Sequence, residues 1–291
     1  MNNSEVNDVF DWWPSPAKIN LFLHVCGRFE NGYHDLQTLF QILDFGDEIG
    51  FSLRKAGLQE NCVQILDNID GLDPQDNLIV KAAQALLPYR TLKSHSVEIK
   101  LNKRIPMGGG LGGGSSNAAT TLLALNKLWQ CECDLSTLLA IGKKLGADVP
   151  VFIKGQTAFA SGIGEKLQSH SVQEQIYLVA SPNVHVSTAA VFTHPSLPRQ
   201  TQKIDFAHYK FEQTQNDCEK LVCNMHPEVA NLLQWLLNYA PSRMTGTGAS
   251  VFSIFESVSD AKKVLKKLPA GTKAFIAKGL DCSPVLQKLA L

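Results

Sequence analysis

The chain has 291 residues, which is enough for one large domain or two ordinary ones with a substantial hydrophobic core. Hydrophobic residues make up 44% of it and charged residues 19%, which is the balance of a soluble globular protein. The 27 basic residues match the 27 acidic ones, so no overall field would attract nucleic acid or an anionic membrane. We therefore expect neither nucleic acid nor a membrane as a partner.

The lack of a recognisable signal peptide and the pattern of cysteines favour the cytoplasm. The first fourteen residues are polar and acidic, without the basic and then apolar regions of a signal peptide. No run of about 20 apolar residues is available to span a bilayer. The seven cysteines are scattered, and the one close pair, Cys131 and Cys133, lacks the further ligands of a zinc site. We expect reduced thiols in a cytoplasmic protein.

The predicted elements follow from two periodicities. Strands are indicated where apolar residues alternate with others, most regularly from Ala17 to Val25. Helices are indicated where apolar residues recur every three or four positions, or where capping residues such as Asp76 and Asn77 precede them. In chain order, we expect strands over residues 17–25, 39–43 and 49–53, a helix over 78–87, a strand over 97–101 and helices over 118–129 and 135–145. A strand over 176–180, a helix over 227–239, a strand over 251–255, a helix over 259–268 and a strand over 274–277 follow.

The order of these elements bears on the fold class and on the domains. In the first half, strands come first and helices later without regular βαβ alternation, which indicates an α+β arrangement. Three glycines, Gly155, Gly162 and Gly164, loosen the chain between residues 154 and 164. We place a domain boundary there, which predicts an N-terminal domain of residues 1–158 and a C-terminal domain of residues 159–291.

The most informative segment is the glycine-rich run of residues 105–123. Six glycines lie between an alternating strand, residues 97–101, and an amphipathic helix. Glycine lets a ligand approach the backbone amides closely, and a helix N-terminus adds unpaired N–H groups and about half a positive charge. The segment therefore predicts a phosphate-binding loop. A flexible linker is the alternative, but linkers seldom lie inside so tight a strand–loop–helix unit.

Two common phosphate motifs do not fit this loop. A Walker A loop requires a lysine before the serine, and Gly114 stands before Ser115. The dinucleotide pattern G-x-G-x-x-G is matched by Gly108, Gly110 and Gly113. Its preceding strand should be apolar throughout, however, whereas residues 97–101 alternate.

Three segments in order resemble the motifs of the galactokinase, homoserine kinase, mevalonate kinase and phosphomevalonate kinase superfamily. They are residues 14–23, 106–116 and 245–252. Further segments resemble those members that act on a sugar alcohol linked to cytidine diphosphate: residues 32–34, 36–41, 76–80, 146–152 and 277–279. The resemblance implies a small-molecule kinase that phosphorylates, with ATP, the 2-hydroxyl of a methylerythritol unit in the non-mevalonate route to isoprenoid precursors. It also implies two domains, ribosomal S5-like and ferredoxin-like, with the site in the cleft between them.

The same resemblance implies roles for particular residues. Asp148 would be the general base and Lys18 its electrostatic partner, in direct transfer without a phosphoenzyme. Asn20 would bind substrate, Tyr33 would stack on the cytosine, and His34 would hydrogen-bond it. Phe192 would cover the opposite face of the base, with Asn77 and Lys103 as secondary candidates near the base of ATP. The phosphates would be bound by Pro106, Met107, Gly108, Gly109, Gly110, Leu111, Gly112, Gly113, Gly114, Ser115 and Ser116.

Four of these residues have a plainer structural alternative. Asp148 precedes Val149 and Pro150, so it could cap a helix with proline just inside it. Lys18 could extend its amine to water, and Tyr33 and His34 could simply pack at a turn.

We expect Mg²⁺ to accompany ATP, but we identify no protein ligands for it.

Two alternative functions stay open at this stage. One is another kinase of the superfamily or its diphosphomevalonate decarboxylase, which would not bind cytidine through Tyr33 and His34. The other is a catalytically silent ligand-binding module, which would bind ATP or a sugar without turnover.

Overall fold

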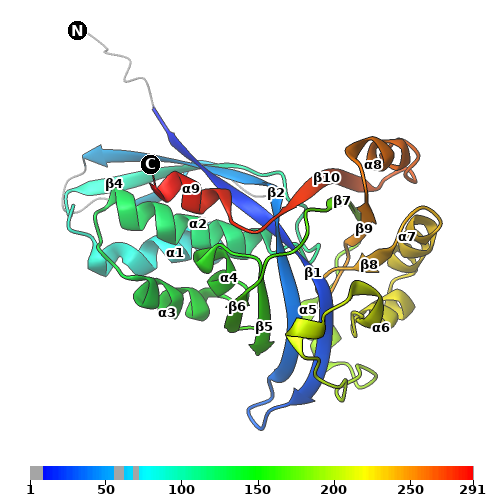
Figure 1. Ribbon diagram of the computed structural model, residues 1–291. Coiled ribbons are helices and arrows are strands. Elements are labelled where there is room, and N and C mark those ends of the chain that lie inside the picture. Colours follow the sequence, from blue (N-terminus) through cyan, green and yellow to red (C-terminus); the bar gives the residue numbers. More distant parts are fainter. Residues whose placement is uncertain (1–8, 56–61, 68–71, 291) are drawn as a thin grey trace.

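Two long antiparallel strands, β1 (Asp11–Arg28) and β2 (His34–Lys55), form the centre of the molecule (Figure 1). The computed structural model describes residues 9–55, 62–67 and 72–290. The alternation from Ala17 to Val25 predicts a half-buried strand, but β1 is buried on both faces there. Its polar residues are therefore enclosed rather than solvated.

The strand β2 replaces two shorter predicted strands, over residues 39–43 and 49–53. It continues through Gly46, where a β-carbon would collide with the backbone of Ser15 in β1. The pairing of β1 with β2 shifts register at this point, between Pro16 and Lys18. Glycine therefore marks a close approach of two strands here, and not a break between two elements.

The strands of both halves form one extended sheet in the order β3-β4-β2-β10-β7-β9-β8, with β1 and β5 also paired to β2. The link between the halves is short: β10 meets β2 at Gly279–Leu43 and Leu280–Ile42. The remaining strands are β3 (Val63–Ile65), β4 (His95–Asn102), β5 (Ala158–Gly162), β6 (Lys166–Ser169), β7 (Ile176–Ser181), β8 (Ser242–Met244), β9 (Val251–Phe255) and β10 (Lys273–Leu280).

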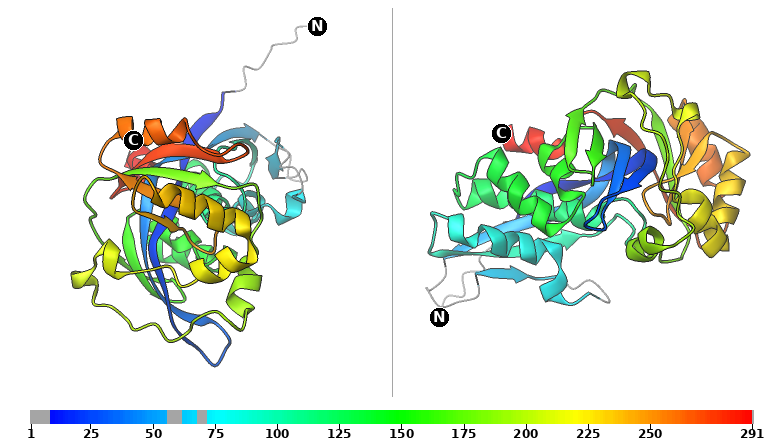
Figure 2. Two further views of the ribbon diagram at one scale, coloured as in Figure 1. Left: turned by 90° about the vertical axis from the view of Figure 1, so that its right-hand side faces the viewer. Right: turned by 90° about the horizontal axis from the view of Figure 1, so that it is seen from below.

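Helices cover the sheet in two groups, which Figure 1 and Figure 2 show at opposite ends of the molecule. One group is α1 (Leu78–Leu86), α2 (Gly113–Leu128), α3 (Leu135–Leu145) and α4 (Val149–Lys154). The other is α5 (Thr188–Thr193), α6 (Glu219–Met225), α7 (Pro227–Leu237) and α8 (Val258–Leu265). The last helix, α9 (Pro284–Ala290), returns to the first group, where Lys288 forms an ion pair with Asp11 at 2.6 Å.

Three hydrophobic clusters hold these layers together. The first lies under α1 to α4 and includes Trp13 and Trp129, and the second lies under α5 to α8. The third contains side chains from both halves, among them Phe22, Phe159 and Phe252. The two halves therefore share buried surface, which fixes their relative position by the hydrophobic effect.

The expected fold class is confirmed: the protein is α+β, with an N-terminal and a C-terminal unit. Elements from residue 158 onward nevertheless pack with N-terminal ones. Strand β5 pairs with β2, and Leu289 of α9 packs on the first cluster. The single boundary at residue 158 stays a prediction. In the described part of the chain, no helix has the length and apolar character needed to cross a membrane.

Candidate active site

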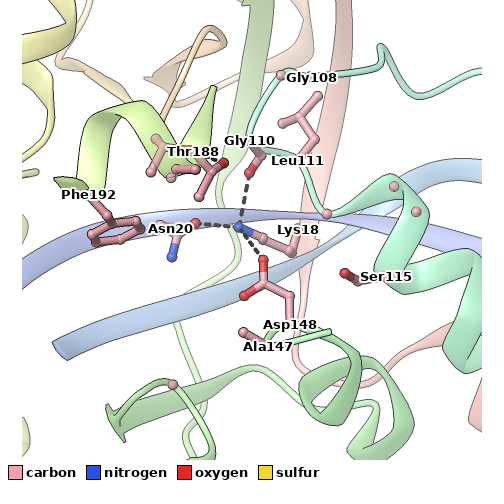
Figure 3. Close-up of a pocket in the computed structure, with 18 of the residues that line it drawn as sticks. Lys18, Asn20, Gly108, Gly110, Leu111, Ser115, Ala147, Asp148, Thr188 and Phe192 are labelled. Carbon is pink, nitrogen blue, oxygen red and sulfur yellow. Dashed lines mark hydrogen bonds and ion pairs between the residues drawn. The ribbon is translucent and has the colours of Figure 1, made fainter. Parts of the chain in front are cut away.

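A pocket of about 790 Å³ opens between the two halves of the chain (Figure 3). Its walls include the catalytic, nucleotide-binding and substrate-binding candidates predicted from the sequence, with one exception. Ser116 does not line the pocket, because it is fully buried and its Oγ accepts a hydrogen bond from Ser15. The C-terminal half contributes Thr188, Ala189, Phe192, Thr193, Gly246 and Thr247.

The glycine-rich loop forms one wall of the pocket and leads directly into α2. Gly110 and Gly112 have φ values of +73° and +71°, which L side chains rarely adopt. A β-carbon on Gly110 would also lie 2.5 Å from the carbonyl oxygen of Thr245. No side chain caps α2, whose N-cap is Gly112. Its first N–H groups lack intrahelical acceptors and are available to an anion.

A second glycine loop, residues 245–248, holds the first one in place. Backbone amides of Ala249 and Ser250 donate to the carbonyl oxygens of Gly108 and Gly109, at 3.3 and 3.2 Å. On the other side, the amide of Lys18 donates to the carbonyl oxygen of Leu111 at 3.0 Å. The phosphate loop is therefore fixed by backbone bonds to both halves of the protein.

Lys18 is 3% exposed, so its amine does not extend to water. Its Nζ donates to Asn20 Oδ1 at 2.5 Å and to the carbonyl oxygen of Gly110 at 3.0 Å. It also lies 3.2 Å from Asp148 Oδ2, and Figure 3 shows the three interactions converging on this one nitrogen. A buried ammonium group that is bonded in this way is a fixed positive charge beside the loop.

Asp148 precedes α4, yet it does not act as the helix cap that the sequence also permits. Its backbone is helical, with φ −88° and ψ −7°, and its side chain makes no capping hydrogen bond. The carboxylate instead faces Lys18 and stays 34% exposed toward the pocket. It is therefore accessible to a ligand hydroxyl, as a general base must be.

Asn20 is fixed by contacts from both halves. Its Nδ2 donates to Thr38 Oγ1 at 2.8 Å, and its backbone amide donates to Thr245 Oγ1 at 2.7 Å. Because Oδ1 accepts from Lys18, the side chain amide has a defined orientation. Asn20 thus supports Lys18 directly.

The aromatic candidates gather at the other end of the pocket. Tyr33 is 60% exposed, whereas His34 is buried and its ring centroid lies 5.1 Å from that of Phe192. His34 Nε2 accepts a hydrogen bond from Arg199 Nε at 3.1 Å. Burial lowers the pKa of His34, and the charges of Arg199 and Arg28 lower it further.

The secondary nucleotide candidates line the pocket but also have structural partners. Asn77 caps α1, with its Oδ1 accepting from the amide of Ile79 at 2.9 Å. Lys103 pairs with the buried Asp47 at 3.0 Å, and burial lowers the pKa of this lysine although Asp47 opposes the change. Asp47 also accepts from the amides of Arg104 and Ile105, both at 2.7 Å, and so anchors the entry to the loop.

Sequence reasoning does not single out Asp47 or Arg199. Asp47 lies within a strand, and Arg199 lies in an irregular segment after α5. Neither belongs to a periodic pattern or to a recognisable motif, so only the tertiary contacts reveal them.

The chain matches known proteins along nearly its whole length. Models of the N-terminal and C-terminal domains of GHMP kinases match residues 77–156 and 203–273. A 4-diphosphocytidyl-2-C-methyl-D-erythritol kinase of Pseudoalteromonas atlantica is 55% identical over 285 residues, which cover 98% of each chain. A protein of the same name from Shewanella halifaxensis is 53% identical over 279 residues, which cover 96% of each chain.

Solved structures also match the chain along most of its length. A crystal structure of 4-(cytidine 5'-diphospho)-2C-methyl-D-erythritol kinase is 30% identical, with a TM-score of 0.80 over 92% of this chain and 99% of that chain. The mevalonate kinase of Methanococcus jannaschii is 14% identical with a TM-score of 0.63, over 95% and 99% of the two chains. This second likeness shows the shared fold alone.

Proposed function

The chain belongs to the GHMP kinase family, and from its close relationship to the 4-diphosphocytidyl-2-C-methyl-D-erythritol kinases we propose that it phosphorylates the 2-hydroxyl of that substrate. It is a small-molecule kinase that uses ATP in isoprenoid synthesis. The single observation that supports the chemistry best is the pairing of Lys18 with Asp148 at 3.2 Å, beside the phosphate loop and inside the pocket.

The proposed reaction is a direct in-line transfer. The 2-hydroxyl oxygen attacks the γ-phosphorus of ATP while the bond to the β–γ bridging oxygen breaks, and ADP leaves with that electron pair. Asp148 accepts the proton of the hydroxyl. The Lys18 ammonium holds the carboxylate in place and stabilises the charge on the moving phosphoryl group.

The rest of the pocket is assigned to binding. The loop amides and the start of α2 would hold the phosphates of ATP. Tyr33, His34 and Phe192 would hold the cytosine at the opposite end, and Asn20 would bind substrate near Lys18. The pocket would thus have a nucleotide side and a substrate side, with Lys18 and Asp148 between them.

Mg²⁺ is proposed to arrive with ATP. Within the described residues, no group of three or more His, Cys, Asp or Glu side chains could hold a metal by itself. Magnesium on a nucleotide needs only one or two oxygen ligands from the protein. The Ser115 hydroxyl lines the pocket and fits that need. When bound, the ion would neutralise charge on the phosphates.

The proposed function is tested by ADP release in a coupled assay. The diphosphocytidyl substrate, mevalonate and homoserine are offered in parallel with ATP. We expect turnover with the first substrate only. Turnover with mevalonate or homoserine would assign the chain to another branch of the family. ATP binding without turnover on any of the three would support a silent binding module.

The aromatic end of the pocket gives a second test. Tyr33→Ala should raise the KM for the diphosphocytidyl substrate about tenfold, because stacking on a base contributes about 1–3 kcal/mol. The KM for ATP should change much less. Tyr89→Ala is the matched control, since Tyr89 is also exposed but does not line the pocket. A larger change in the KM for ATP would move Tyr33 to the nucleotide side.

A further inference from the structure

Arg199 uses its whole guanidinium group at the aromatic end of the pocket. Its Nε donates to His34 Nε2 at 3.1 Å. Its two terminal nitrogens donate to four backbone carbonyl oxygens, those of Phe192 at 3.0 Å, His194 at 2.8 Å, Leu197 at 3.0 Å and Pro195 at 3.5 Å. All five N–H groups of the side chain therefore have an acceptor.

The bond to His34 determines where the proton of the imidazole lies. A guanidinium group donates but cannot accept, so Nε2 must present a lone pair to it. In a neutral imidazole the proton is then on Nδ1. Among the residues that the structure describes, none hydrogen-bonds Nδ1 of His34, and the ring lines the pocket.

The charges around His34 keep it in this form. Burial lowers the pKa of His34, and it is lowered further by Arg199, which faces the ring from the segment after α5, and by Arg28, which faces it from β1. Asp35, the next residue in β2, pairs with Lys203 at 2.6 Å. Successive residues of a strand point to opposite faces, so this carboxylate does not neighbour the ring.

We infer that Arg199 is a positioning residue that fixes His34 as its Nδ1–H tautomer. The same guanidinium group holds the carbonyl of Phe192, whose ring packs against His34. Arg199 thus joins the start of β2 to the end of α5 and leaves the Nδ1–H group of His34 as a donor for the substrate. This inference rests on the proposed function, in which the substrate base is cytosine, whose N3 and O2 atoms are acceptors.

The tautomer is tested first in the ligand-free protein by ¹⁵N NMR, with the His34 signals identified by their loss in His34→Asn. We expect a protonated Nδ1 and an unprotonated Nε2. A protonated Nε2 would overturn the inference. This result does not depend on the substrate, so a failure of the proposed function would leave it standing.

The second test is the kinetics of Arg199→Met. Without the Arg199 donor, the neutral ring of His34 can move its proton to Nε2 and then has no Nδ1–H group to offer the substrate. The KM for the diphosphocytidyl substrate should therefore rise roughly 3- to 10-fold at pH 8. Removing the Arg199 charge should also raise the pKa of His34. At a pH below that value the ring carries both protons, regains the Nδ1 donor, and the KM should fall toward that of the unmodified protein.

The controls separate this role from a merely structural one. Arg199→Lys retains a donor for Nε2 and should restore most of the affinity. Lys203→Met removes a nearby positive charge without a bond to His34 and should leave the KM unchanged. The inference would be overturned if Arg199→Met lost kcat and ATP affinity at every pH and Arg199→Lys lost them as well. That result would show that Arg199 has only a structural role.

Discussion

Replacing Asp148 by asparagine should lower kcat at least about 100-fold, which is the lower scale for the loss of a general base. The KM for ATP should stay nearly unchanged. Asparagine has almost the same shape as aspartate, but its amide cannot take the proton of the attacking hydroxyl. Steady-state ADP release with both substrates varied measures the two quantities separately.

The matched control is Asp134→Asn. Asp134 is a true helix cap, because its Oδ1 accepts from the amide of Thr137 at 2.8 Å, and it does not line the pocket. This variant should retain full kcat, since asparagine also caps helices well. Near-normal turnover in Asp148→Asn would remove the base assignment.

The features that sequence predicts well are those fixed by neighbouring residues. The strand–loop–helix unit around residues 105–123 is predicted because its glycines, its upstream alternation and its downstream helical face are all local. The helix α3 begins and ends where expected, after Asp134 and before Gly146, since capping is also local. The resemblance to a known family then supplied the roles that no spacing could indicate.

The features that sequence misses depend on contacts between distant segments. Lys18 and Asp148 are 130 positions apart by their numbers, so no spacing relates them, and their pairing is expected only through the family resemblance. The strands predicted over residues 39–43 and 49–53 are one strand, and the sequence does not reveal the close approach at Gly46, because the strand that approaches it lies elsewhere in the chain. The roles of Asp47 and Arg199 are invisible for the same reason, since each acts on backbone groups or a ring that folding brings to it.

Lys18→Met should cause the other large loss, of about 100- to 1,000-fold in kcat, as when one preorganised donor to a developing charge is removed. Methionine keeps most of the apolar stem, so the buried site stays filled. The change leaves Asn20 Oδ1 and the Gly110 carbonyl oxygen without this donor, so the unfolding free energy should fall by about 1–3 kcal/mol. Thermal unfolding must therefore accompany the kinetics.

A control of the same type is available on α4. Lys154→Met removes an amine that donates to the carbonyl oxygen of Leu167 at 2.9 Å and that does not line the pocket. It should leave kcat unchanged. An equal loss in both variants would indicate general damage to the fold and not a role for the Lys18 charge.

The double variant Lys18→Met/Asp148→Asn tests whether the two residues act as one unit. If Lys18 works largely by holding the Asp148 carboxylate in place, its removal costs little once the carboxylate is gone. The double variant should then lose little more activity than the worse single variant. If the two residues act independently, the losses of kcat in the single variants should instead multiply, to at least about 10,000-fold in the double variant. That product would assign Lys18 wholly to the phosphoryl group, and would remove the coupling inferred from the 3.2 Å ion pair.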